Sequence, residues 1–120
     1  METSLPNAGT IEILYYGVWG SIYGDNIDIL VGHVVCRQLG YNGAEQVFHT
    51  AVFGPVKGPM WIWDIQCYGN ETKISQCKVK TFDDATYRWF PVDYRNPLYA
   101  GAVICSGVNS SASTDRKSVV

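Results

Sequence analysis

The chain has 120 residues and a formal net charge of −2, with 47% hydrophobic and 17% charged residues. A chain of this length buries one modest core, and its apolar content excludes intrinsic disorder. It has no net basic charge to attract nucleic acid or an anionic membrane surface, so neither is an expected partner.

The first predicted element is a strand over residues 10–16, where apolar and polar residues alternate. Gly17 turns the chain, and residues 18–23 are the predicted hairpin partner.

One amphipathic helix is predicted over residues 28–39. Gly40 is placed to end it in the left-handed conformation, and Gly32 weakens it by about 1 kcal/mol relative to alanine. The helix therefore depends on packing. Its apolar stripe consists of Val31, Val34, Val35 and Leu39. Its candidate N-caps are Asp25, Asn26 and Asp28.

The second half of the chain contains shorter elements. Residues 44–52 hold short strand-like pieces, and residues 60–67 and 102–106 are predicted strands. A tight polar loop over residues 67–77 and a long aromatic, irregular segment over residues 78–99 separate them. One helix among several short strands predicts an α+β domain.

The chain has four cysteines at scattered positions. An even number of cysteines favours two disulfides in a secreted protein, but the spacing leaves three pairings open. The alternative is a zinc site. His33 lies near Cys36, but no two cysteines have the C-x2-C spacing and His49 has no partner at ligand spacing. The four cysteines are Cys36, Cys67, Cys77 and Cys105.

Two glycosylation sequons, at Asn70 and Asn109, agree with an extracellular location. The N-terminus lacks the basic and apolar regions of a signal peptide, and no apolar run is long enough to span a bilayer. Residues 1–8 are therefore expected to be a leader segment outside the domain. Residues 108–120 are expected to be a polar tail or linker.

Five segments carry recognisable motifs in a consistent order. They are GVWGSI at 17–22, VVCRQLGY at 34–41, FGP…GPMW at 53–61, CYGNE at 67–71 and VICS at 103–106. These segments resemble the GxWGTV, VVCRQLGY, FGxGxGPIW, CxGxE and VxCS motifs of scavenger receptor cysteine-rich (SRCR) domains. The resemblance covers residues 9–106.

The resemblance implies a curved antiparallel β-sheet that cradles one α-helix, over a domain spanning residues 9–107. It also implies the disulfides Cys36–Cys105 and Cys67–Cys77. Six-cysteine members carry a further cysteine where this chain has Tyr23, and its partner is absent as well, so no odd thiol remains.

Many SRCR domains bind calcium through acidic residues, and calcium prefers several oxygen ligands. One such acidic set is largely lost in this chain. A second set partly survives as Asp64, Asn70 and Glu71, although Trp63 stands at its first acidic position. The resemblance therefore implies calcium as the one candidate cofactor. The alternative is structural: Glu71 caps the 67–77 turn, and Asp64 pairs with a nearby lysine.

The aromatic 78–99 segment is the predicted ligand-binding surface, because arginine and aromatic residues are enriched in binding hot spots. The alternative is that these aromatic residues fold inward and cover the core. The candidate contact residues are Arg88, Trp89, Phe90, Tyr94, Arg95 and Tyr99.

The sequence therefore predicts a non-enzymatic extracellular binding module for a protein, glycan or polyanionic ligand. Neither His33 nor His49 has a serine or carboxylate at a recognisable motif spacing. The alternative is a structural domain of a matrix or filament protein, whose 78–99 surface is covered by partner chains. Either form can belong to a larger multidomain protein.

Overall fold

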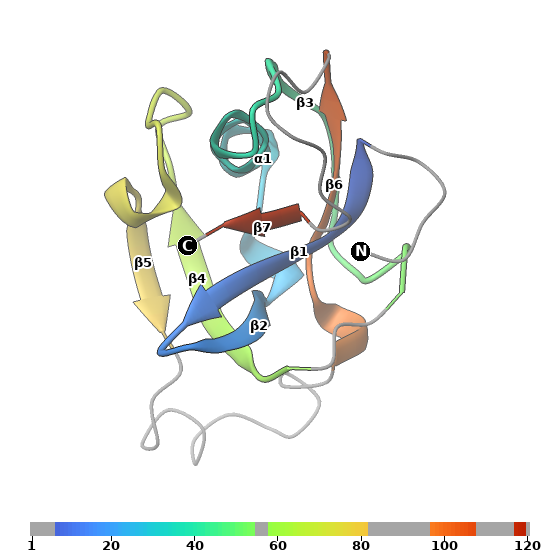
Figure 1. Ribbon diagram of the computed structural model, residues 1–120, viewed down its shortest axis with the longest axis vertical. Helices are drawn as coiled ribbons and strands as arrows, with labels where there is room; N and C mark the ends of the chain where they lie inside the picture. Colours follow the sequence, from blue (N-terminus) through green and yellow to red (C-terminus); the bar gives the residue numbers. More distant parts are fainter. Residues whose placement is uncertain (1–6, 55–57, 82–96, 108–116, 120) are drawn as a thin grey trace.

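The computed structural model describes residues 7–54, 58–81, 97–107 and 117–119. Seven strands form one curled sheet in the order β3-β6-β1-β2-β4-β5, with β7 also paired to β1, and one helix packs beside β3 and β6 (Figure 1). The helix α1 spans Ile29–Gln38. The strands are β1 (Ala8–Tyr15), β2 (Val18–Ile22), β3 (Gly43–Phe48), β4 (Met60–Gln66), β5 (Lys78–Thr81), β6 (Ala102–Ser106) and β7 (Lys117–Val119). Short 3-10 helices lie at Gly24–Asn26, Ile74–Gln76 and Pro97–Tyr99.

The α+β fold with one helix in a curled sheet is confirmed, but the sheet is mixed and not wholly antiparallel. Strand β2 pairs with β4 in parallel, as does β1 with β7. The chain passes through α1 and β3 between β2 and β4, and such a crossover brings the second strand back in the same direction.

The predicted hairpin forms, with β1 and β2 antiparallel. Its two turn residues, Tyr16 and Gly17, both have positive φ, at 51° and 76°. This is the pattern of a two-residue type I′ turn, where asparagine and glycine are usual. A bulky residue such as Tyr16 rarely adopts this conformation, and its side chain is 84% exposed.

Helix α1 forms within its predicted range. The Asp28 side chain accepts a hydrogen bond of 3.0 Å from the Val31 N–H and caps the helix. Gly40 follows the end of the helix with φ 96°, as predicted. A Cβ on Gly32 would lie 2.5 Å from Cγ1 of Val47, so the glycine lets the helix approach β3 closely. The apolar stripe faces the core, and Val31, Val34 and Val35 are buried.

Both disulfides join the pairs that the resemblance implied. Cys36 on α1 is bonded to Cys105 on β6, and Cys67 is bonded to Cys77 across the polar loop. No cysteine is free, so the thiolates that a zinc site would need are not available.

The structure adds three features to the predicted elements. Strand β5 forms at the start of the segment expected to be irregular, because Lys78–Thr81 pairs with β4. Part of the expected polar tail, Lys117–Val119, forms β7. Strand β1 begins at Ala8, which is fully buried although residues 1–8 were expected to lie outside the domain.

Candidate functional site

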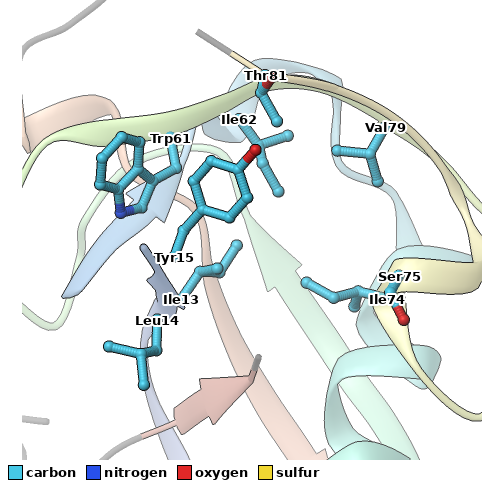
Figure 2. A pocket seen from close by; sticks show the side chains of 9 residues that line it. All are labelled: Ile13, Leu14, Tyr15, Trp61, Ile62, Ile74, Ser75, Val79 and Thr81. Carbon is cyan, nitrogen blue, oxygen red and sulfur yellow. The ribbon is translucent and has the colours of Figure 1, made fainter. Parts of the chain in front are cut away.

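An apolar hollow of about 150 Å³ opens between the β1–β2 hairpin and the β4–β5 pair. Figure 2 shows Tyr15 and Trp61 along one side and Ile74, Ser75 and Val79 along the other. We call this hollow, lined by β1, β4, β5 and the Ile74–Gln76 turn, the hairpin groove. Of the described residues that line it, none is charged.

Two aromatic side chains form the exposed wall of the hairpin groove. The ring of Tyr15 meets Trp61 edge to face with centroids 5.2 Å apart, which is a favourable aromatic geometry. The indole N–H of Trp61 donates to the Val18 carbonyl at 2.9 Å, so the ring is fixed to the hairpin. Tyr16 extends the aromatic surface, with its ring centroid 4.4 Å from that of Tyr15. The site is thus an apolar recess whose aromatic wall is fixed in place, and an exposed tyrosine, Tyr16, lies beside it.

The floor of the hairpin groove follows from strand alternation. In β5, Val79 and Thr81 face the groove, whereas Lys78 and Lys80 are exposed on the other face of the strand. Ile74 is buried under the groove and belongs to the core. The hollow is therefore an opening onto the core of the domain.

The predicted ligand-binding residues fall mostly outside the described residues. Arg88, Trp89, Phe90, Tyr94 and Arg95 lie within 82–96, so their arrangement stays a prediction. The remaining candidate, at position 99, lies in the Pro97–Tyr99 turn. It is exposed and contacts Tyr23 edge to face at 6.4 Å.

Of the calcium candidates, Glu71 has the partners that the structural alternative expected, whereas the ammonium group of Lys80 lies over the Trp63 ring, 5.2 Å from its centroid. Asp64 lies on β4 directly across from Lys80 on β5. Glu71 accepts hydrogen bonds of 2.9 Å from the backbone N–H groups of Tyr68 and Gly69, one on each carboxylate oxygen. The third candidate, Asn70, directly precedes Glu71 in the chain and is exposed. The Glu71 carboxylate is already engaged by two backbone amides, which leaves it less able to bind calcium. No step of the proposed function uses the ion.

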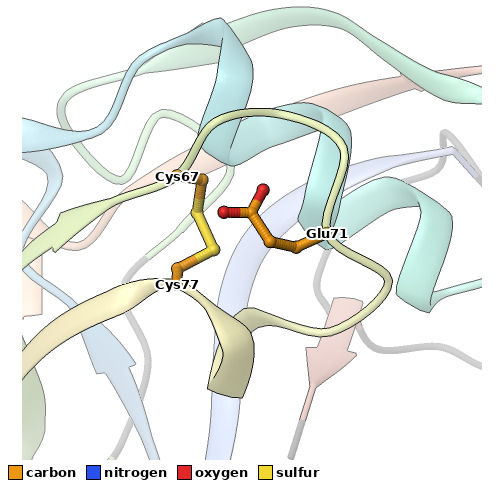
Figure 3. A group of neighbouring side chains, drawn as sticks. All are labelled: Cys67, Glu71 and Cys77. Atoms are coloured by element: carbon orange, nitrogen blue, oxygen red, sulfur yellow. A yellow bond between two sulfur atoms is a disulfide. The ribbon is translucent and has the colours of Figure 1, made fainter.

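One other group in the described part of the chain resembles a metal site. Ligand atoms of Cys67, Glu71 and Cys77 lie within 4.8 Å of one another, and Figure 3 shows the carboxylate directed towards the sulfur atoms. Both sulfur atoms are bonded to each other, and a disulfide is not the thiolate that metals require. We conclude that this group is structural.

Glu71 should make the stability of the domain depend on acidic pH. Hydrogen bonds from backbone N–H groups, that of Tyr68 above all, hold the pKa of Glu71 below its ordinary value of 4.5. A depressed folded-state pKa contributes stability above the unfolded-state value, and this is lost as pH falls through the folded-state value. Glu71→Gln should therefore unfold more easily than wild type at pH 7, with the difference shrinking below about pH 4.5. Thermal melting across this range measures it.

A matched control for this prediction is Glu45→Gln, which removes an exposed carboxylate from β3. It changes the net charge by the same amount without touching the 67–77 loop. An equal acid dependence in both variants would contradict the role assigned to Glu71.

Among the described residues, both histidines have backbone partners and no catalytic arrangement. The Nδ1 atom of His33 accepts a hydrogen bond of 2.9 Å from the Ala44 N–H, and Nε2 of His49 lies 3.1 Å from the Ile27 carbonyl oxygen. Both rings thus contact the backbone, a structural use of histidine.

The hairpin groove was not predicted from the sequence, because its residues come from three strands and a turn that are distant along the chain. A partial signal was present. Two adjacent tyrosines precede Gly17, at a turn where small polar residues are usual.

The chain matches the family model described as "Scavenger receptor cysteine-rich domain" over residues 1–106. It is 39% identical over 75 residues to the bovine (Bos taurus) macrophage scavenger receptor types I and II, covering 62% of this chain and 17% of that protein. It is also 39% identical over 100 residues to lysyl oxidase homolog 2 of Mus musculus, covering 83% of this chain and 12% of that protein. The chain thus spans less than a fifth of these relatives.

Solved structures share the fold. The third SRCR domain of murine neurotrypsin superimposes with a TM-score of 0.72 at 26% identity, covering 90% of this chain and 94% of that domain. The SRCR domain of mouse MARCO in its dimeric form gives a TM-score of 0.67 at 25% identity, covering 83% and 87%.

The helical segments that the structure describes include none with the length and hydropathy needed to cross a membrane.

Proposed function

We propose that this chain, which belongs to the scavenger receptor cysteine-rich domain family, binds an extracellular protein by holding one of its apolar side chains in the hairpin groove. The observation that carries the proposal is an uncharged recess onto the core, walled by Tyr15 and Trp61.

The extracellular location predicted from the sequence is confirmed by the family match and agrees with the two disulfides, which persist in oxidising compartments. The match to a lysyl oxidase homolog covers only 12% of that protein, so its name carries no activity over to this chain. We propose a module without catalysis of its own.

The groove sets the chemistry of the ligand. A hollow of about 150 Å³ accommodates one large aliphatic or aromatic side chain, and the absence of charge among its described lining residues favours an uncharged one. Aromatic residues beside a desolvated pocket are typical of binding hot spots. Tyr16, 84% exposed at the rim, can add a contact without a large entropic cost, because a tyrosine side chain has few rotatable bonds.

Selection of a displayed random peptide library on the oxidised protein tests the proposal. The selected peptides should share one large apolar residue. Tyr15→Ala should weaken their binding at least about tenfold, because truncating a hot-spot residue costs about 2 kcal/mol or more. Ser75→Tyr, at an exposed position on the groove wall, should have a similar effect by filling the recess. Calorimetry or fluorescence anisotropy measures both.

Val52→Tyr is the matched control, because Val52 is also exposed but does not line the groove. It should leave the affinity unchanged. Selected peptides that are rich in charged residues, or whose binding neither groove variant weakens, would contradict the proposal. The predicted 78–99 surface would then be the candidate binding site.

The alternative function is an assembly domain whose aromatic surface is covered by other chains. Exposed Leu98 and Tyr99, at the end of the 78–99 segment, favour it. A binding module stays monomeric at high concentration, whereas an assembly domain self-associates. Light scattering after size-exclusion chromatography distinguishes the two. Calcium at Asp64, Asn70 and Glu71 stays a prediction, which calcium titration of wild type and Asp64→Ala checks.

A further inference from the structure

We infer that Asn70 carries an N-linked glycan, which shields the neighbouring side of the 67–77 loop around Tyr68 and leaves the Tyr15–Trp61 wall of the hairpin groove open. The sequon is Asn70-Glu71-Thr72. Asparagine in this context accepts a glycan on a surface loop of a secreted protein. The inference goes beyond the proposed function and can fail independently of it.

The geometry of the loop directs Asn70 outward. Gly69, immediately before it, is buried against Leu30, and its carbonyl oxygen accepts a hydrogen bond from the Arg37 guanidinium on α1. The loop is thus anchored to the helix one residue before the sequon. Asn70 itself is exposed.

The side-chain amide of Asn70 is also unused within the described part of the structure. Its sequon neighbours have partners: Glu71 binds the backbone of Tyr68 and Gly69, and the Thr72 hydroxyl donates to Oε1 of Gln76 at 3.1 Å. No hydrogen bond of the described residues involves the Asn70 side chain. A glycan on this amide would therefore break no hydrogen bond among the residues that the structure describes.

The modification is a group transfer from a lipid-linked oligosaccharide diphosphate. A bond forms between Nδ2 of Asn70 and C1 of the first sugar, and the bond from C1 to the diphosphate oxygen breaks. The lipid diphosphate leaves with the electron pair, and the amide loses one proton. No oxidant or reductant is needed.

A glycan at this position covers a defined part of the surface. The 67–77 loop lies at the end of β4 opposite to the hairpin turn (Figure 1). Two features there would otherwise be open: the side chain of Tyr68, 89% exposed, and a hollow whose lining includes Gln66, Glu71 and Lys78. A branched glycan is bulky and hydrated, so it would keep a protein partner away from Tyr68 while the Tyr15–Trp61 wall of the groove stays accessible.

The test is to secrete the full chain from mammalian cells behind an added signal peptide. The glycan is then removed with a peptide-N-glycosidase in heavy-oxygen water. Peptide mapping by mass spectrometry should find labelled aspartate at position 70. Asn70→Gln and Thr72→Ala should each lose this glycan, whereas Thr72→Ser, which keeps the sequon and its hydroxyl, should retain it.

Unmodified Asn70 in the secreted wild-type protein would overturn the inference, and this result needs no variant to fold. A second readout concerns shielding. Peptides selected on the groove should bind the glycosylated and the deglycosylated protein equally. If deglycosylation strengthens their binding, the glycan reaches the groove and the proposed shielding is wrong, although the groove itself stands.

Discussion

Loss of the Cys36–Cys105 disulfide should lower the free energy of unfolding more than any other change considered for this domain. The bridge joins residues 69 apart, and the chain-entropy relation gives about 4 kcal/mol for a loop of that size. Both cysteines are fully buried between α1 and β6, so Cys36→Ala with Cys105→Ala also removes core contacts. Urea denaturation of the double variant should show a loss of about 4 kcal/mol or more.

The second disulfide provides the matched control. Cys67 and Cys77 are only 10 residues apart, and the same relation gives about 3 kcal/mol. Arg37 and Gln38 on α1 still hold this loop, through the Gly69 carbonyl and the Ile74 N–H. The control variant, Cys67→Ala with Cys77→Ala, should therefore keep a folded core. If this control loses as much or more free energy of unfolding, the Cys36–Cys105 disulfide is not the more stabilising of the two.

Substitution of Gly58 should destabilise the domain about as much as loss of the Cys67–Cys77 disulfide. This glycine precedes β4 at the place where β4 meets β2, and a Cβ on it would overlap the carbonyl oxygen of Trp19. The obstacle is backbone, so β2 and β4 would have to move apart and the parallel pairing between them would weaken. We expect Gly58→Ala to cost about 3 kcal/mol, the upper end of the usual range for overpacking, as measured by urea denaturation.

Gly54→Ala is the control for Gly58→Ala, because it introduces backbone strain without steric overlap. Gly54 has a positive φ of 111°, but a Cβ there would meet nothing within 4 Å. Its substitution should cost only about 1 kcal/mol, from backbone strain alone. If both alanine variants lose the same stability, the close approach of Gly58 to β2 does not limit the fold.

The local signals in the sequence predicted α1 well. Asp28, the valine stripe and Gly40 act through neighbouring residues along the chain, so their roles could be recognised without a structure. The resemblance to SRCR domains supplied the disulfide pairing that spacing left open. The parallel pairing of β2 with β4 could not be predicted, because it depends on how the crossover through α1 packs and not on either strand alone.

The candidate site was harder to predict for a related reason. Tyr15, Trp61 and Val79 lie on three different strands, and only the curled sheet brings them to one hollow. The role of Glu71 was also hard to predict, although its partners are close to it in the sequence. The family resemblance implied a calcium ligand there, with a cap of the 67–77 turn as the alternative, and only the structure shows that backbone N–H groups are its partners.

The pairing of β1 with β6 has a consequence for how such domains are combined. Asn7 and Cys105 are separated by 98 positions, yet their backbones and the Asn7 amide are joined by hydrogen bonds of 2.7 and 2.8 Å. The two ends of the family-matched region, 1–106, therefore lie side by side at Asn7 and Cys105, although the chain later returns to the sheet as β7. A domain whose two ends lie close together can be inserted into another protein, or repeated in tandem, without distorting the domains on either side. This geometry suits a domain that makes up only 12% to 17% of the length of its relatives.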